Sequence, residues 1–167
     1  MRSIGGLLLI VAQGFRFELA LLSIAKGKIM LVILSCGGKK AATPQPASLM
    51  YKGPYFTVCL RYARFLTSDD HIRILSSKYG LLPLTQEINP YEMRITDKEA
   101  ISNSDLLNQA VSQGLVDESD VIIVAGVLYA TKVLKIWPHA QTPLMGIGKM
   151  GKQMKYMNEQ VELASDV

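Results

Sequence analysis

The chain has 167 residues, of which 49% are hydrophobic and 19% are charged. This composition excludes a disordered, collagen-like or coiled-coil chain, and the length suits one compact domain that buries about two-thirds of its unfolded surface. Two cysteines and two histidines are too few for a disulfide framework or for a zinc site built from them alone. We therefore expect neither a metal nor a cofactor.

Most of the net charge of +4 comes from the first 29 residues, which hold four basic side chains and one acidic side chain. The apolar run at residues 4–12 is too short to span a bilayer and matches an export signal only weakly. We expect a cytoplasmic protein without a membrane partner. Residues 26–29 are what a purine-rich ribosome-binding sequence encodes when it is read in frame. Residues 1–29 are therefore interpreted as a leader before a start at Met30 or as a poorly packed extension. Residues 30–167 form the expected single α/β domain.

The first expected elements are two strands and a helix. The apolar run at residues 31–34 is followed by Ser35-Cys36-Gly37-Gly38, which is typical of a strand buried on both faces that ends in a tight loop. Apolar residues recur at helical spacing over residues 54–66, with Pro54 in the first turn, and this predicts an amphipathic helix. Residues 72–75 predict the next strand.

The second half repeats this alternation. A capping box from Thr96 to Glu99 predicts a helix that runs to about Gln113 and that residues 102–104 interrupt. The remaining expected elements are a buried strand at residues 121–124, a helix at 127–137 ended by Pro138, a short fourth strand at 143–145, and a last helix with Met150, Met154, Met157 and Val161 on one stripe.

The expected fold is a three-layer α/β/α sandwich with a mainly parallel sheet of four strands or slightly more. Short β-branched strands that lack alternation and that alternate with helices predict parallel pairing with helices on both faces. Residues 37–53 and 81–95 are the longest irregular stretches. Loops of this length in a compact domain are usually functional.

The loops after the predicted strands are expected to form an anion-binding crevice, because the carboxyl ends of parallel strands meet at one edge. These loops offer glycine, hydroxyl and lysine groups, which suit phosphate or carboxylate. The alternative is that these loops bind no ligand, because glycine commonly ends strands and lysine is a common solvent-exposed residue. No P-loop motif is present. The candidate binding residues are Ser35, Gly37, Gly38, Lys39, Lys40, Tyr51, Ser76, Lys78, Tyr79, Tyr91, Gly126 and Lys149.

Cys36 and Glu92 are the candidate catalytic residues. Cys36 lies in a glycine loop near two lysines, and basic neighbours of this kind favour a reactive thiolate; the alternative is a small residue that fits the turn. Glu92, like Glu87, can activate water if the second long loop covers the crevice; the alternative is a solvated carboxylate. Tyr79 or Tyr91 is expected to stack on a base.

Several segments resemble a family of small bacterial and phage proteins that are often labelled as similar to the peroxide-stress protein YaaA. The resemblance runs from Met30 to about Glu159, and its most specific parts are the SKYGLL segment at residues 77–82 and Pro90-Tyr91-Glu92. The loop around Cys36 more distantly resembles the lysine-transfer domain of archaeosine synthase, whose fold is similar to uracil-DNA glycosylases. These resemblances imply work on a nucleobase or a modified nucleic acid. Unlike the glycosylases, this chain has no aspartate or asparagine in the loop after its first strand.

The sequence thus predicts an enzyme directed at a nucleotide, nucleobase or nucleic acid, with glycosylase-like or base-modifying chemistry. Phosphate is expected to be held by Ser35, Lys39, Lys40, Ser76 and Lys78. The alternative is a non-catalytic module that binds a nucleotide or nucleic acid in a stress response or in phage biology. A binder of small metabolites is the third interpretation, and the oligomeric state stays open.

Overall fold

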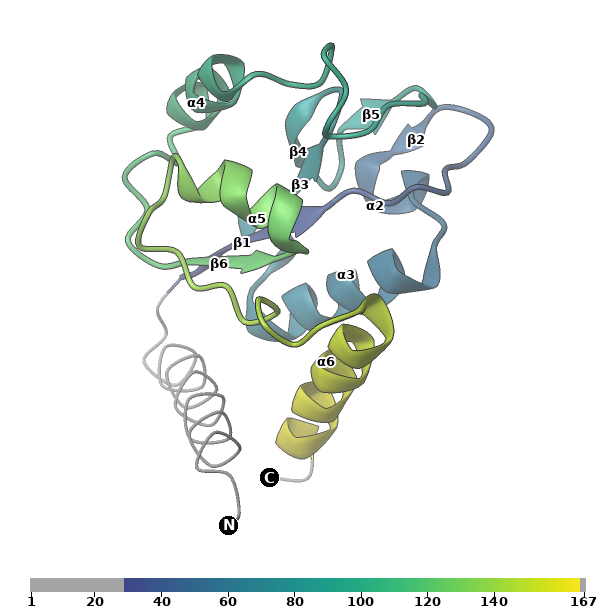
Figure 1. The fold of residues 1–167 in the computed structure, drawn as a ribbon, viewed down its shortest axis with the longest axis vertical. Helices are drawn as coiled ribbons and strands as arrows, with labels where there is room; N and C mark the ends of the chain where they lie inside the picture. Colours follow the sequence, from purple (N-terminus) through teal and green to yellow (C-terminus); the bar gives the residue numbers. More distant parts are fainter. Residues whose placement is uncertain (1–28, 166–167) are drawn as a thin grey trace.

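The computed structural model describes residues 29–165, and Figure 1 shows their arrangement. The predicted leader, residues 1–29, lies outside this part apart from Ile29. Four strands form one sheet in the order β4-β3-β1-β6. The strands are β1 (Leu31–Ser35), β3 (Ile72–Ser76), β4 (Gly80–Pro83) and β6 (Val121–Val124). β1 pairs in parallel with β3 and β6, and β4 is antiparallel to β3, which confirms the expected α/β fold with a mostly parallel sheet.

Successive side chains of a strand point to opposite faces of the sheet, and a buried apolar cluster covers each face. Val32 and Leu34 of β1 belong to one buried cluster, whereas Leu31 and Ile33 belong to the other. α3 (Pro54–Leu66) and α6 (Met150–Ser165) cover the first face, and α4 (Asn103–Ser112) and α5 (Val127–Leu134) cover the second (Figure 1). All β1 side chains are therefore buried, as a central strand requires.

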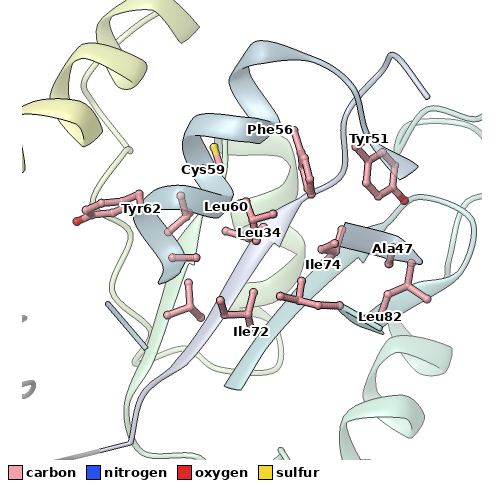
Figure 2. Close-up of a cluster of buried hydrophobic side chains, with 14 of the residues drawn as sticks. Leu34, Ala47, Tyr51, Phe56, Cys59, Leu60, Tyr62, Ile72, Ile74 and Leu82 are labelled. Carbon is pink, nitrogen blue, oxygen red and sulfur yellow. The ribbon is translucent and has the colours of Figure 1, made fainter. Parts of the chain in front are cut away.

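The larger cluster joins α3 to the sheet, as Figure 2 shows. Phe56, Cys59 and Leu60 of α3 are buried against strand residues that include Leu34 and Ile72. Full burial of a large apolar side chain contributes about 1.5–3 kcal/mol. The predicted helix at residues 54–66 is confirmed, with the apolar spacing read from the sequence facing the sheet.

The second cluster lies under α4 and α5. Trp137 is fully buried there, and its Nε1–H donates to the carbonyl of Leu115 at 3.0 Å. α5 ends at Leu134, three residues before the predicted end, because the chain enters tight turns ahead of Pro138. The last helix is confirmed, with Met157 buried and Met150 exposed at its start.

The predicted helix start at Thr96 is wrong. Residues 95–100 form turns, in which the backbone N–H of Arg94 donates to the carboxylate of Asp97 at 2.7 Å. α4 begins instead after Ser102, whose Oγ accepts a hydrogen bond from the backbone N–H of Asp105 at 3.0 Å. Aspartate and serine side chains both compete for backbone groups, and here aspartate stabilises a turn while serine caps the helix.

The predicted strand at residues 143–145 is also wrong. Those residues form turns, and the chain pairs with β6 only through an isolated bridge from Gln141 to Ile122. The fourth strand is β4, in a segment expected to be irregular. β3 and β4 form a hairpin through a turn at residues 77–79, and β4 begins at Gly80, whose φ of +78° is available to glycine without strain.

The two long loops are tied to each other at the end of the sheet. The first contains β2 (Gln45–Pro46) and α2 (Ala47–Met50), and the second contains β5 (Glu87–Ile88). β2 pairs antiparallel with β5, which draws both loops together near α2 (Figure 1). A single turn of 3₁₀ helix, η1 (Asp69–His71), leads into β3. Between residues 29 and 165, no helix has the length and apolar character needed to cross a membrane.

Candidate functional site

The connections that leave β1 and β6 go to opposite faces of the sheet. β1 leads towards α3 on one face, and β6 leads into α5 on the other, although the two strands are neighbours. Such a switch opens a crevice beyond the carboxyl ends of the two strands. Cys36, which follows β1, and Tyr129, in the first turn of α5, meet there.

A cavity of about 850 Å³ occupies this crevice, within the size range of sites for small organic ligands. Glycine, aromatic and methionine residues make up most of its wall. The lining residues are Ser35, Cys36, Gly37, Gly38, Gly53, Pro54, Tyr55, Phe56, Gly126, Tyr129, Gly148, Lys149, Met150, Gly151, Gln153 and Met154.

Three helices begin at this cavity. Gly53 and Pro54 at the start of α3, Gly126 before α5, and Met150 at the start of α6 all line it. None of these three helices has an acidic residue in its first turn, and α3 and α5 have no side-chain cap. The free N–H groups and the positive ends of the helix dipoles therefore favour an anion in the cavity.

Cys36 is half-buried in the wall of the cavity and faces hydroxyl groups. Its Sγ lies 3.2 Å from the Oη of Tyr129 and 4.0 Å from the Oγ of Ser77. The Ser77 hydroxyl donates to the carbonyl of Met93 at 2.8 Å. Burial, and then proximity to Cys36, raise the pKa of Tyr129, so its hydroxyl remains protonated at neutral pH. The protonated Tyr129 hydroxyl can donate to the sulfur or accept from the thiol.

A chain of buried hydroxyls lies next to Cys36. The Oγ of Ser76 accepts the backbone N–H groups of Lys78 at 3.2 Å and Tyr79 at 3.0 Å. Both of its lone pairs are then used, so Ser76 donates to the Oη of Tyr91 at 2.8 Å, and Tyr91 donates to the Oη of Tyr51 at 2.9 Å. The chain of donors therefore runs from Ser76 towards Tyr51.

The two tyrosines of the hydroxyl chain, Tyr51 and Tyr91, are part of the buried structure. Tyr51 is 3% exposed and Tyr91 is 8% exposed, so neither ring offers much surface to a base, although the sequence predicts base stacking at Tyr91. Burial is the main cause that raises the pKa of Tyr91 to about 12, and burial raises the pKa of Tyr51 further. Tyr79 is half-buried, and its ring packs edge-to-face with the Tyr91 ring, with 5.4 Å between the ring centres.

The turns after β1 and β3 meet, as the sequence predicted. The backbone N–H of Cys36 donates to the carbonyl of Leu75 at 3.1 Å, beside the start of the β3–β4 turn. The Nζ of Lys40 lies 4.3 Å from the centre of the Tyr91 ring. Lys149 lines the large cavity. Lys39 and Lys78 are exposed and line neither this cavity nor a smaller one of about 410 Å³ that shares Cys36 and Tyr129 with it.

Residues 30–159 match a protein family of unknown function, DUF6884. The chain belongs to this family. No curated protein matches the chain. The match confirms the expected membership in a family without an assigned function, and it spans the residues over which the motif resemblance was found. The relation to YaaA and to archaeosine synthase stays a prediction.

The two predicted catalytic residues of this DUF6884 protein occupy different places. Cys36 lines the cavity, and Ser35, Gly37, Gly38 and Gly126 line it as well. Glu92 and Glu87 are exposed and line neither cavity. The part of the chain between residues 29 and 165 contains no group of three or more His, Cys, Asp or Glu side chains placed to bind a metal ion.

Ten residues of the cavity wall are absent from the sequence-based candidates, and three of the ten have polar side chains. Tyr129 lies one helical turn after Gly126, and this position in the helix after β6 was the available signal. Tyr55, in the predicted helix at residues 54–66, is half-buried and donates to Gln153 Oε1 at 2.5 Å. Gln153 in turn donates to the carbonyl of Gly148 at 2.7 Å and so holds the turn that carries Lys149.

Proposed function

We propose that this protein is a cytoplasmic enzyme that acts on the base of a nucleotide, free or within a nucleic acid, bound in the large cavity. The observation that carries the proposal is the cavity itself. It joins three helix N-termini and one lysine to an aromatic, glycine-rich wall, with a cysteine in that wall. A ligand with an anionic end and a flat apolar end suits such a site.

The phosphate end lies against the turn before α6. Lys149 supplies a positive charge there, and the first turns of α3 and α6 supply N–H groups. Lys149 is exposed and has no hydrogen-bond or ion-pair partner within residues 29–165, so its ammonium group is available to a ligand. This assignment replaces the phosphate site expected at Ser76 and Lys78, because Ser76 is fully buried and its lone pairs are already used.

The base end lies towards Tyr129 and Cys36. The Tyr129 ring is half-buried, so part of it is available to stack against a base. The neighbouring backbone at Gly37 and Gly126 has no side chains and allows a flat ring to approach closely.

Cys36 is the nucleophile in this proposal, since Glu92 does not line the cavity. The sulfur adds to an electrophilic ring carbon of a C=N bond, the π electron pair moves to the nitrogen, and the thiol proton reaches that nitrogen through the Tyr129 hydroxyl. The step is an addition of S–H across C=N, so it consumes no further reactant. The motif resemblance to archaeosine synthase and to YaaA-like proteins supports a nucleobase or nucleic-acid substrate.

A non-catalytic module that binds a nucleotide or nucleic acid, in a stress response or in phage biology, is the second candidate. One observation favours it. Within the described residues, the hydrogen-bond partners of the Cys36 sulfur are hydroxyls, and neither an imidazole nor a carboxylate contacts it as a base.

Binding and turnover distinguish the two candidates. We expect nucleoside 5′-monophosphates, in ribo and deoxyribo forms, to raise the melting temperature, because a ligand that binds only the folded state stabilises it. Lys149→Ala should weaken this shift. Lys155→Ala is the matched control, since it removes an equal charge from an exposed position on α6 and disrupts only a surface pair with Glu159. Equal shifts in both variants would contradict the phosphate assignment.

Mass spectrometry of nucleotides and short oligonucleotides after incubation tests the chemistry. Cys36→Ala is expected to keep binding and to lose turnover. Turnover that persists in Cys36→Ala rules out the nucleophile, and binding without turnover in the unmodified protein favours the non-catalytic module.

A further inference from the structure

A smaller cavity of about 410 Å³ adjoins the large one. We infer that it is a second subsite, which binds a second phosphate-bearing group of the same ligand. The inference rests on the proposed function and adds to it that the ligand carries two phosphate groups separated by a nucleoside. The lining residues are Cys36, Gly37, Gly38, Lys40, Met93, Arg94, Ile95, Thr96, Leu128 and Tyr129.

The two cavities share part of their walls. Cys36, Gly37, Gly38 and Tyr129 line both. Between the cavities the wall at Gly37 and Gly38 consists of backbone without side chains, and a Cβ built on Gly38 would meet no atom within 4 Å. A ligand bound in the large cavity can therefore continue past Gly38 into the smaller one, with Cys36 beside its middle.

Basic side chains mark both ends of this path. The charged residues that line the smaller cavity are Lys40 and Arg94, and Lys149 is the charged residue that lines the larger one. The guanidinium of Arg94 is exposed and has no hydrogen-bond or ion-pair partner in the part of the chain from residue 29 to 165. Asp97, which accepts from the Arg94 backbone, lies outside the lining. A free guanidinium can bind a phosphate through two parallel hydrogen bonds.

The rest of the smaller cavity is apolar. Met93 and Ile95 line it from the loop before α4, and Leu128, which is 63% exposed, lines it from α5. Tyr129 adds an aromatic ring. This surface suits a second nucleoside, whereas a nucleoside triphosphate would place all its phosphates at one end. The chemistry that fits is two phosphorylated nucleosides in sequence, as in a free dinucleotide or in a nucleic-acid strand.

Calorimetric titration of the full chain with homologous ligands tests this inference. The probes are the four deoxynucleoside 5′-monophosphates, the corresponding triphosphates, the 5′-phosphorylated homodinucleotides, and longer single-stranded homo-oligonucleotides. We expect a dinucleotide to bind at least about tenfold more tightly than its mononucleotide, which is the typical effect of one further charged hydrogen-bonded contact.

Two substitutions should remove this advantage, and Arg94→Gln should do so while the mononucleotide affinity stays unchanged. Arg94→Gln removes the cation, and Gly38→Val fills the opening between the cavities. Gly38 is not among the glycines with positive φ, so the fold can accept a side chain there. Lys98→Gln, at an exposed position outside both linings, should leave every affinity unchanged. Gly53→Val, in the wall of the large cavity alone, should change both affinities by the same factor.

The outcomes separate this inference from the proposed function. If mononucleotides bind but Arg94→Gln and Gly38→Val leave the dinucleotide advantage intact, the second subsite is overturned and the proposed function stands. If neither ligand binds, both are overturned. A triphosphate with the same Arg94-dependent gain also overturns the subsite. A longer oligonucleotide that binds as well as the dinucleotide identifies a strand, and loss of binding with length identifies a free dinucleotide; both results support two phosphorylated units.

Discussion

Tyr91→Phe should destabilise the protein, because it removes the central hydroxyl of the buried chain beside the cavity. That hydroxyl is 2.8 Å from Ser76 Oγ and 2.9 Å from Tyr51 Oη. Ser76 is 0% exposed, so water cannot replace the lost acceptor of its proton. A buried donor without a partner costs about 1–3 kcal/mol, and Tyr51 also loses the bond that it accepts. We expect the free energy of unfolding to fall by about 2–3 kcal/mol.

Urea denaturation measures this loss directly. The midpoint should fall while the dependence of the unfolding free energy on urea stays unchanged, because the substitution hardly alters the surface exposed on unfolding. In thermal unfolding, the expected decrease is about 4–12 °C, from a shift of about 2–4 °C per kcal/mol for a chain of this size.

Tyr79→Phe is the matched control. Its hydroxyl is 3.4 Å from the carbonyl of Asn89 at an exposed position, so the expected change is within about 0.5 kcal/mol. The double variant Tyr51→Phe with Tyr91→Phe should lose less than the sum of the single losses, by at least about 0.5 kcal/mol, because the two side chains share a bond. Equal losses in Tyr79→Phe and Tyr91→Phe, or additive losses in the double variant, would refute the hydroxyl chain as a stabilising unit.

Two further predictions concern alkaline pH and the β3–β4 hairpin. Burial raises the pKa of Tyr91 from an ordinary value of 10.0 to about 12, so the folded state holds this proton more tightly than the unfolded state. The stability that Tyr91 contributes in this way is complete below pH 10 and is lost as the pH rises through 12. Urea midpoints measured at a series of pH values will show this loss. Gly80→Ala should lower the free energy of unfolding by about 2–4 kcal/mol, because a methyl group at φ +78° collides with the side chain of Gln109. Gly114→Ala is the control: Gly114 has a φ of +68° but open space around it, so the expected loss is only about 1–2 kcal/mol. Equal losses of the two variants in urea denaturation would contradict this account.

The strands β1, β3 and β6 and the helix α3 could be predicted because their signals are local. A parallel strand buried on both faces is typically a continuous apolar run. β1 and β6 begin with such runs, and in β3 only Arg73 interrupts one. α3 combines Pro54 in its first turn with apolar residues at helical spacing, so its bounds are explicit in the sequence.

The hairpin depends on contacts distant in sequence, and the start of α4 depends on which of two neighbouring side chains, Asp97 or Ser102, bonds the backbone as a turn or as a helix cap. The backbone N–H of Leu81 donates to Gln109 Oε1 at 2.8 Å, and Gln109 Nε2 donates to the carbonyl of Tyr79 at 2.9 Å. An α4 side chain thus satisfies backbone groups at the turn into β4, which no reading of the SKYGLL segment alone can show. Thr96 has a suitable capping partner in Glu99, yet turns around Asp97 replace the helix.

The position of the site could be predicted, but its lining could not. Parallel pairing places the residues that follow β1, β3 and β6 at one edge whatever their side chains do, and this is why Cys36 and Ser77 meet. Whether a side chain in a loop points inwards depends on backbone angles that composition does not specify. Lys39 and Lys78 therefore lie outside the cavities, whereas Lys149 lies in the wall.

The crevice lies beyond β1 and β6, whereas the neighbouring end of β3 is filled. Pairing of β2 with β5 draws the second long loop over the end of β3, where Tyr91 reaches Ser76 and Tyr51. Those side chains occupy the space that a ligand would need beyond β3. Beyond β1 and β6, by contrast, the wall includes Gly37, Gly38 and Gly126, which have no side chains to fill it. The hydroxyl chain thus supports one wall of the cavity, and a substitution within it should alter ligand binding only to the extent that it destabilises the fold.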